Sequence, residues 1–215
     1  GGGSAEDPVV VQRYVTHPIT VQGCKFDLRL YVLVTSFNPL EAWLCREGFA
    51  RFATRPFTLD DSALGDRFVH LTNSSVQKKA EVLPEFLARA QPAGGSKVSL
   101  TRLRWLLGAQ GVEWGPLWGR ITEVVTACLF AVQDAIPACP QAFELFGFDV
   151  LLDTSGGVWV LEVNGSPSLS LDTPLDRVVK PRMLRDALAI VDPLPWDREA
   201  LLEVLAARTS ARGRL

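Results

Sequence analysis

The sequence lacks the features that mark membrane and secreted proteins. No apolar run reaches the roughly 18 residues that a membrane-spanning helix needs, and no basic stretch followed by an apolar one opens the chain as a secretory leader would. The four cysteines are scattered with no CxxC pair, at positions Cys24, Cys45, Cys128 and Cys139. This pattern favours reduced thiols over a disulfide framework or a zinc site. We therefore expect a cytoplasmic chain with no membrane partner.

Several catalytic and nucleic-acid-binding signatures are also missing. The chain has no nucleophile elbow, no HExxH, no GxxxxGK[ST] and no GxGxxG. His17 precedes a proline and His70 has no evident Cys or Ser partner, which argues against a histidine-based hydrolase. The net charge of −2, from 22 basic and 24 acidic residues, gives no chain-wide basic footprint for nucleic acid.

The residues that are present predict a globular α+β protein. Of the 215 residues, 47% are hydrophobic, enough for a substantial core in one large domain or two small ones. We expect strands over 9–15, 26–37, 41–46 and 49–54, with a hairpin turn at Glu47-Gly48, a loop over 55–66 and a short strand over 68–71. Helices are expected around 100–107, over 117–132, from Thr173-Pro174 to Ile190, and after Asp197. The third helix should break or kink at Pro181. A strand hairpin is expected over 143–163, before the third helix. Strands, helices, a hairpin and helices in this order are typical of α+β.

The strand hairpin carries the strongest physical clue to a site. Joining Asp153 to Val158 by a tight loop places Asp149 directly opposite Glu162. Two opposed carboxylates repel each other. This repulsion must be offset by a shared proton, a basic side chain or a metal.

Strand periodicity places Asn164 on the same face as Glu162, and Trp159, Leu161 and Val163 on the other. Asp149, Glu162 and Asn164 then form an all-oxygen set suited to Mg²⁺. A carboxylate pair held by arginine at a sheet edge is the alternative.

A second clue lies in the strand that begins at Lys25. Lys25, Asp27 and Arg29 share one face, whereas the other face is continuously apolar and must pack. The polar face is a solvated surface, an internal salt-bridge ladder or a site for a polyanion. If it belongs to a site, we expect it to face the hairpin across a cleft.

Two further features are weaker. The segment His70-Leu71-Thr72-Asn73-Ser74-Ser75 groups hydrogen-bonding side chains, as a capped loop also does. Arg51 stands between Phe49 and Phe52, against which it could simply stack.

Six motifs occur in a definite order along the chain: Gln12-Arg13-Tyr14, Lys25-Phe26-Asp27-Leu28-Arg29, Arg51-Phe52-Ala53-Thr54, His70-Leu71-Thr72-Asn73, Phe148-Asp149 and Leu161-Glu162-Val163-Asn164-Gly165-Ser166-Pro167-Ser168-Leu169. Together they resemble the tubulin tyrosine ligase-like family over roughly residues 9–192, with 143–191 most similar to its polyglutamylase branch. The resemblance implies an ATP-grasp fold, with ATP between two lobes and an antiparallel sheet flanked by helices.

The resemblance also implies roles for single residues. The adenine would be held, mainly through backbone, by Gln12, Arg13, Tyr14 and Val15. The rest of the nucleotide and acceptor site would be lined by Lys25, Asp27, Arg29, His70, Leu71, Thr72 and Asn73. The Mg²⁺ ligands would be Asp149, Glu162 and Asn164, and catalysis would rest on Lys25, Arg29, Arg51 and Glu162.

The activity implied is ATP- and Mg²⁺-dependent ligation of free glutamate to carboxylates of tubulin tails, through an acyl phosphate. A glycine ligase of the same family and a non-catalytic microtubule-binding fragment are the alternatives. Basic clusters at Lys78-Lys79, at Arg102 with Arg104, and at Arg177, Lys180, Arg182 and Arg185 could meet acidic tails, although each is equally typical of a solvated helix face. We expect a monomer in the cytoplasm and cytoskeleton, with the cilium or basal body as a further location.

The start of the chain predicts an incomplete unit. Gly1-Gly2-Gly3-Ser4 is similar to a linker, and a strand-like segment follows within a few residues. We expect a flexible start over 1–8, a partial catalytic domain over 9–192 and a C-terminal helical extension over 193–215. The resemblance implies a further lobe before the adenine segment, with phosphate-binding lysines and a loop that covers ATP. We therefore expect the isolated chain to expose apolar surface on 9–15 and 26–37, and to bind ATP weakly without the covering loop.

Overall fold

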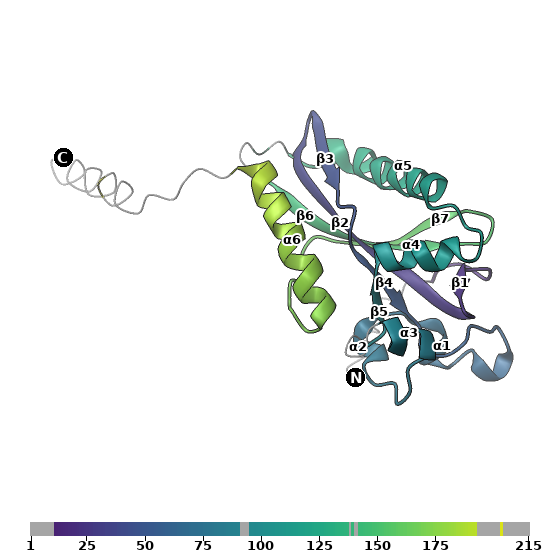
Figure 1. The fold of residues 1–215 in the computed structure, drawn as a ribbon. Coiled ribbons are helices and arrows are strands. Elements are labelled where there is room, and N and C mark those ends of the chain that lie inside the picture. The colour runs from purple at the N-terminus through teal and green to yellow at the C-terminus, as the bar shows by residue number, and fades with distance from the viewer. Residues whose placement is uncertain (1–10, 91–94, 138, 140–141, 193–202, 204–215) are drawn as a thin grey trace, which may run out of the picture.

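The computed structural model has the predicted α+β architecture, an antiparallel sheet with helices on both faces (Figure 1). It describes residues 11–90, 95–137, 139, 142–192 and 203. The expected helix after Asp197 lies outside these residues apart from Glu203, which is helical, and so do Val9 and Val10 of the first expected strand.

The sheet is built around one long strand, β2, Cys24–Phe37. Its seven strands include the path β5-β4-β2-β6-β7, and β1 and β3 also pair with β2. The other strands are β1 (Thr20–Val21), β3 (Leu40–Leu44), β4 (Phe49–Phe52), β5 (Lys97–Ser99), β6 (Glu144–Leu152) and β7 (Val158–Asn164). The predicted strand over 26–37 is therefore the spine of the fold.

The larger core lies on the apolar face of β2. Leu28 and Leu30 are fully buried there against α4 (Leu100–Gly108) and α5 (Trp114–Val132). These helices bring leucine, isoleucine and valine at helical spacing, with Ile121 fully buried at the centre of α5. Apolar burial on this face stabilises the fold and fixes which face of β2 carries the polar residues.

Helix α6 (Pro174–Val191) covers part of the opposite, polar face (Figure 1). It begins with the predicted cap, because the side chains of Thr173 and Asp176 form a reciprocal capping box. The helix runs through Pro181 without a break, so the prediction of a break there is wrong. Val179 and Met183, buried against Tyr31 and Phe49 on either side of the proline, hold the helix in place.

Short helices gather at one end of the sheet. They are η1 (Asp61–Ala63), α1 (Arg67–His70), α2 (Ser74–Gln77) and α3 (Glu85–Ala90), and η2 (Gln133–Ala135) follows α5. The prediction of a strand over 68–71 is wrong. Asp66 caps a helical turn there by accepting a hydrogen bond from the Phe68 amide, and this local contact outweighs the apolar composition.

Two further strand predictions are wrong. Residues 11–15 form no strand, and Val11 is 92% exposed. The strands β3 and β4 form no hairpin at Glu47-Gly48, because each pairs with a different part of β2. The hairpin turn of this region is Asn38-Pro39, between β2 and β3.

The hairpin of β6 and β7 is present, with Asp149 opposite Glu162 as predicted. Its register contains a β-bulge, because Val150 pairs with Val160 and leaves Leu161 without a partner. The bulge corrects the assignment of faces. Trp159 lies opposite Leu151, on the same face as Asp149 and Glu162, where an unbroken strand would have placed it on the other.

The described residues contain neither a membrane-spanning helix nor a disulfide bond. None of their helices combines the length and apolarity needed to cross a membrane. Their cysteines, Cys24, Cys45, Cys128 and Cys139, are all free thiols.

Candidate functional site

Most of the predicted site residues line one cavity of about 330 Å³ on the polar face of the sheet. Its predicted lining residues are Gln12, Arg13, Tyr14, Val15, Lys25, Asp27, Arg51, His70, Leu71, Thr72, Asn73, Asp149 and Glu162. Arg29 and Asn164 are the two predicted residues outside this lining, and both contact residues of it. Segments far apart in the sequence therefore converge here.

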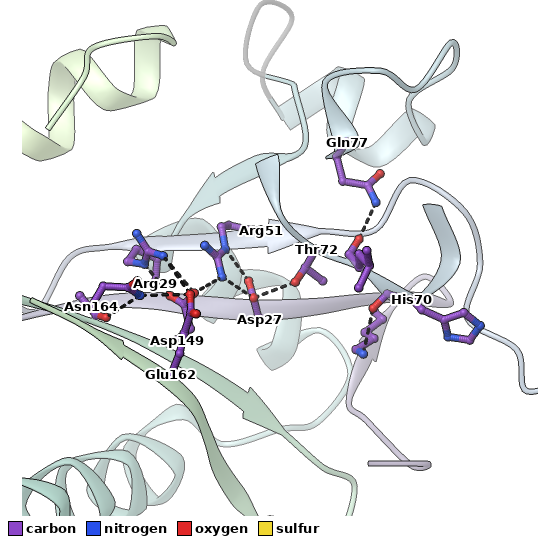
Figure 2. Close-up of polar contacts among 12 residues, drawn as sticks. Asp27, Arg29, Arg51, His70, Thr72, Gln77, Asp149, Glu162 and Asn164 are labelled. Atoms are coloured by element: carbon purple, nitrogen blue, oxygen red, sulfur yellow. Dashed lines mark hydrogen bonds and ion pairs between the residues drawn. The ribbon is translucent and has the colours of Figure 1, made fainter. Parts of the chain in front are cut away.

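An alternating chain of charges crosses the sheet beneath this cavity (Figure 2). Arg29 donates from Nε to Asp149 Oδ1 at 2.5 Å and from Nη2 to Oδ2 at 2.9 Å. Arg51 donates to both oxygens of Asp27, at 2.7 and 2.5 Å, and also to Asp149 Oδ2 at 2.7 Å. Of the alternatives for the polar face of β2, this network corresponds to the internal salt-bridge ladder, and it lies in the candidate site.

The strand arrangement corrects one expectation. Arg29 pairs with Asp149 in adjacent hydrogen-bonded strands, β2 and β6, so the polar face of β2 lies beside the hairpin and not across a cleft from it. Lys25, Asp27 and Arg51 are buried, which excludes a solvated surface for this face.

The network sets the protonation of its members. Burial alone would raise the pKa of Asp149, but the Arg29 hydrogen bond and the Arg51 charge together lower it. Burial would lower the pKa of Arg51, but hydrogen bonds and charge from Asp27 and Asp149 raise it well above its usual value. Both groups therefore stay ionised at neutral pH.

Lys25 lies at the other end of the cavity, beside the 11–17 segment. Its Nζ donates to Tyr14 Oη at 3.1 Å and to the His70 carbonyl at 3.0 Å. His70 Nε2 lies 3.1 Å from the Ala63 carbonyl, which can only accept, so a neutral His70 carries its proton on Nε2 and accepts from Tyr14 at Nδ1. Burial lowers the pKa of Lys25, while the charge of Asp27 opposes this effect.

The 70–73 segment joins the site through hydrogen bonds. Thr72 Oγ1 donates to Asp27 Oδ2 at 2.7 Å. Gln77, which the sequence analysis did not single out, accepts from Thr54 N and Oγ1 and donates to the Leu71 carbonyl. This buried amide fixes the segment, and no motif in the sequence signals it.

Leu151 and Leu161 are lining residues that the sequence analysis also missed. Leu161 reaches the cavity because it is the extra residue of the bulge, and Leu151 lies two residues from Asp149 on β6. They give one wall of an otherwise polar cavity an apolar surface.

The predicted metal ligands fit a divalent cation only in part. Glu162 Oε1 accepts from Asn164 Nδ2 at 3.1 Å, and the Glu162 side chain is 54% exposed. The Glu162 carboxyl also lies within hydrogen-bond reach of Asp149, and its Oε1 lies 4.0 Å from Arg29 Nη2. Among the described residues Asn164 uses only its Nδ2, so its amide oxygen and the Glu162 carboxylate are of the kind that Mg²⁺ prefers.

Asp149 differs, since two arginines already neutralise it. No group of three or more His, Cys, Asp or Glu side chains among the described residues is arranged to hold a metal ion.

Two of the three predicted basic clusters contain a lysine that is paired with an aspartate. Lys180 is buried and paired with Asp176 at 3.0 Å, and Lys78 pairs with Asp172. Arg177, Arg182 and Arg185 remain exposed on α6.

Comparison with known proteins identifies the family of the chain. The model of the tubulin-tyrosine ligase family matches residues 3–200. A probable tubulin polyglutamylase, TTLL9 of Bos taurus, is 42% identical over 187 residues, covering 85% of this chain and 38% of the relative. The tubulin monoglutamylase TTLL4 of Homo sapiens is 39% identical over 84% of the chain and 16% of the relative. The tubulin polyglutamylase ttll-5 of Caenorhabditis elegans is 38% identical over 94% of the chain and 29% of the relative.

The polar face of this α+β fold thus groups the arginine–carboxylate network beside one cavity. The chain belongs to the tubulin-tyrosine ligase family. It spans between 16% and 38% of the length of the three relatives described.

Proposed function

We propose that this chain carries part of the active site of an ATP-dependent tubulin glutamate ligase with an ATP-grasp fold. The convergence of the predicted nucleotide, metal and catalytic residues on one cavity is the observation that carries the proposal. Family membership and the names of the glutamylase relatives support it.

The arginine–aspartate network suits a site that receives a polyphosphate. Arg29 and Arg51 neutralise Asp149 and Asp27. In the proposed complex, Arg29 would contact phosphate oxygens in place of Asp149, and Asp149, Glu162 and Asn164 would hold Mg²⁺. The exchange keeps the local charge balanced, because phosphate replaces the carboxylate beside the guanidinium.

The nucleotide would extend from these residues toward the 11–17 segment. Leu151 and Leu161 offer an apolar surface to its base, and the backbone of Gln12–Val15 offers hydrogen-bonding groups. Lys25 and Arg29 would contact the phosphates, with Asp27 at the ribose, and the 70–73 segment would line the acceptor side.

The proposed reaction has two balanced steps. A carboxylate oxygen of the acceptor attacks the γ-phosphorus of ATP, ADP leaves and an acyl phosphate forms. The glutamate amine then attacks the acyl carbon, loses a proton and expels phosphate. The cations at Lys25, Arg29 and Arg51 would stabilise negative charge on the phosphate oxygens. Mg²⁺, when bound, would neutralise charge on the phosphates.

The substrates follow from the family and not from the cavity. The relatives are named tubulin polyglutamylases and monoglutamylases, which favours glutamate over glycine as the added amino acid. Acidic tubulin tails would be the acceptor, with a cytoskeletal or ciliary location for the protein.

Ligation assays on the full-length protein test the proposal. Microtubules are incubated with ATP, Mg²⁺ and radiolabelled glutamate or glycine in competition. We expect ATP-dependent incorporation of glutamate into tubulin and little of glycine. Preferred incorporation of glycine would replace glutamate in the proposal, and no incorporation of either would leave a non-catalytic microtubule-binding role.

A further inference from the structure

A second cavity, of about 710 Å³, lies against the candidate site and has no role in it so far. Arg13, Tyr14 and Val15 line both cavities, so the two are neighbours along the 11–17 segment. The remaining lining residues are Thr16, His17, Asp153, Thr154, Ser155 and Trp159. The second cavity therefore lies between the 11–17 segment and the turn of the β6–β7 hairpin.

Trp159 is fixed in an unusual way for a half-exposed residue. The residue is 49% exposed, and it belongs to neither buried hydrophobic cluster. Its Nε1 nevertheless donates to Asp153 Oδ2 at 2.7 Å. An indole that is anchored by a hydrogen bond, with much of its surface free, is typical of aromatic contact with a ligand.

Asp153 is itself built into the turn. Its Oδ1 accepts from the amides of Ser155 and Gly157, at 2.9 and 2.8 Å, and from Ser155 Oγ. A side chain at Gly157 would place Cβ 2.4 Å from Asp153 Oδ2, so glycine is required for this close approach. These contacts leave the carboxylate little freedom and hence hold the indole in one orientation.

The bulge brings Trp159 onto the face of the candidate site. Trp159 lies opposite Leu151, and Leu161 is the extra residue between Trp159 and Glu162. An apolar strip, formed by Leu151, Leu161 and Trp159, therefore runs from the carboxylates toward the hairpin turn.

The facing wall offers hydrogen-bonding groups of the backbone. The hairpin holds the end of the 11–17 segment, since the Thr154 amide donates to the His17 carbonyl at 2.9 Å. Within the described part of the chain, the backbone groups of Arg13–Thr16 make no hydrogen bond to other backbone groups. A flat apolar wall facing a free backbone edge suits a planar heterocycle, and charged phosphates belong near the guanidinium groups of Arg29 and Arg51.

We propose that Trp159 forms an outer stacking wall for the purine base of the bound nucleotide, and that Asp153 is a positioning residue that orients its indole. This inference rests on the proposed function, in which ATP binds at the site.

The test measures binding of Mg·ATP and of inorganic tripolyphosphate to the full-length protein by calorimetry. Base stacking on an aromatic side chain implies that Trp159→Ala weakens ATP binding roughly 5- to 100-fold. Tripolyphosphate has no base, so its affinity stays within about twofold of the wild-type value. Trp159→Phe is expected to lie between, and Asp153→Asn to weaken ATP binding while sparing tripolyphosphate.

A matched control is Trp105→Ala, because Trp105 is 61% exposed on α4, away from both cavities. It should leave both affinities unchanged. ATP should also quench part of the tryptophan fluorescence. This quenching should be lost in Trp159→Phe, which keeps an aromatic ring and the fold. It should persist in Trp105→Phe.

The outcomes separate the two levels of inference. The stacking role is overturned if Trp159→Ala binds ATP as tightly as the wild-type protein does. It is also overturned if ATP quenches the fluorescence of Trp159→Phe as much as that of the wild-type protein. Either result leaves the ligase proposal standing. Equal losses for ATP and tripolyphosphate assign Trp159 to the fold and also overturn it. Failure of the wild-type protein to bind ATP overturns the proposed function, and this inference with it.

Discussion

Arg51 and Asp149 form an ion pair although their strands are not neighbours in the sheet. Arg51 lies on β4 and Asp149 on β6, with β2 between, and Arg51 Nη2 donates to Asp149 Oδ2 at 2.7 Å. The same guanidinium binds Asp27 on the intervening strand. One buried arginine thus links three strands at the candidate site, so the same contacts serve the stability of the sheet and the proposed function.

Asp149→Asn is predicted to destabilise the protein strongly. The change removes the carboxylate charge that neutralises Arg29 and Arg51, and loss of one partner of a buried ion pair costs roughly 3–5 kcal/mol. Denaturant unfolding monitored by circular dichroism measures the loss. Asp172→Asn is the control, because Asp172 pairs with Lys78 at the surface, where both side chains are more than half exposed, and should cost about 1 kcal/mol or less. Equal effects of the two changes would contradict the role of the network.

Gly147→Ala is predicted to disturb the site without altering any charge. A Cβ at this position would lie 2.8 Å from Pro167 Cβ and 3.4 Å from Arg29 Cδ. The crowding should displace Arg29 from Asp149 and cost about 1–3 kcal/mol in unfolding free energy.

Gly165→Ala is the matched control for this change. A Cβ at Gly165 meets no atom within 4 Å, and the substitution should be tolerated. A crystal structure of Gly147→Ala with the Arg29–Asp149 pair unmoved would show that the crowding is absorbed elsewhere.

The pairing of Asp149 with Glu162 could be predicted from the sequence, because a strong turn signal fixes the register of a hairpin. The faces of β7 could not be predicted, because the bulge at Leu161 shifts the alternation and no residue type announces it. Strict alternation therefore places Trp159 and Leu161 on the wrong side of the sheet.

The apolar composition of two segments was misleading for a different reason. Residues 11–15 are rich in valine but border two cavities and form no strand. The 68–71 segment is a helical turn, because Asp66 caps it. Alternation alone does not reveal whether a neighbouring strand is available, whereas β2 has such neighbours along its whole length.

Gln77→Leu is predicted to loosen the 70–73 segment. The change leaves the Thr54 amide and the Leu71 carbonyl without the partner that Gln77 provides, at a cost of about 1–3 kcal/mol for each buried polar group. Hydrogen exchange should become faster at Leu71, Thr72 and Asn73. Gln110→Leu, at an exposed position after α4, should leave this exchange unchanged, and unaltered protection in Gln77→Leu would contradict the anchoring role.

The stability of the protein should fall in acid partly through Asp176. Burial would raise the pKa of this carboxyl, but hydrogen bonds from Lys97, Thr173 and Lys180 lower it to about 2. Because the folded-state pKa lies below the unfolded value of about 4, the stabilisation is complete above pH ~4 and is lost as the pH falls toward 2. Unfolding free energies measured between pH 5 and 2 should therefore decline less steeply in Asp176→Asn than in wild type, and parallel curves would contradict this assignment.

Ligation by a Glu162→Gln variant of the full-length protein tests the proposed active site most directly. Glu162 is half-exposed and keeps its shape in glutamine, so the unfolding temperature should not change, whereas loss of a negative metal ligand should lower glutamate incorporation roughly 100-fold or more. Glu144→Gln, an exposed change at the far end of β6, should retain full activity. Retained ligation by Glu162→Gln with normal dependence on Mg²⁺ would contradict a catalytic centre at this cavity.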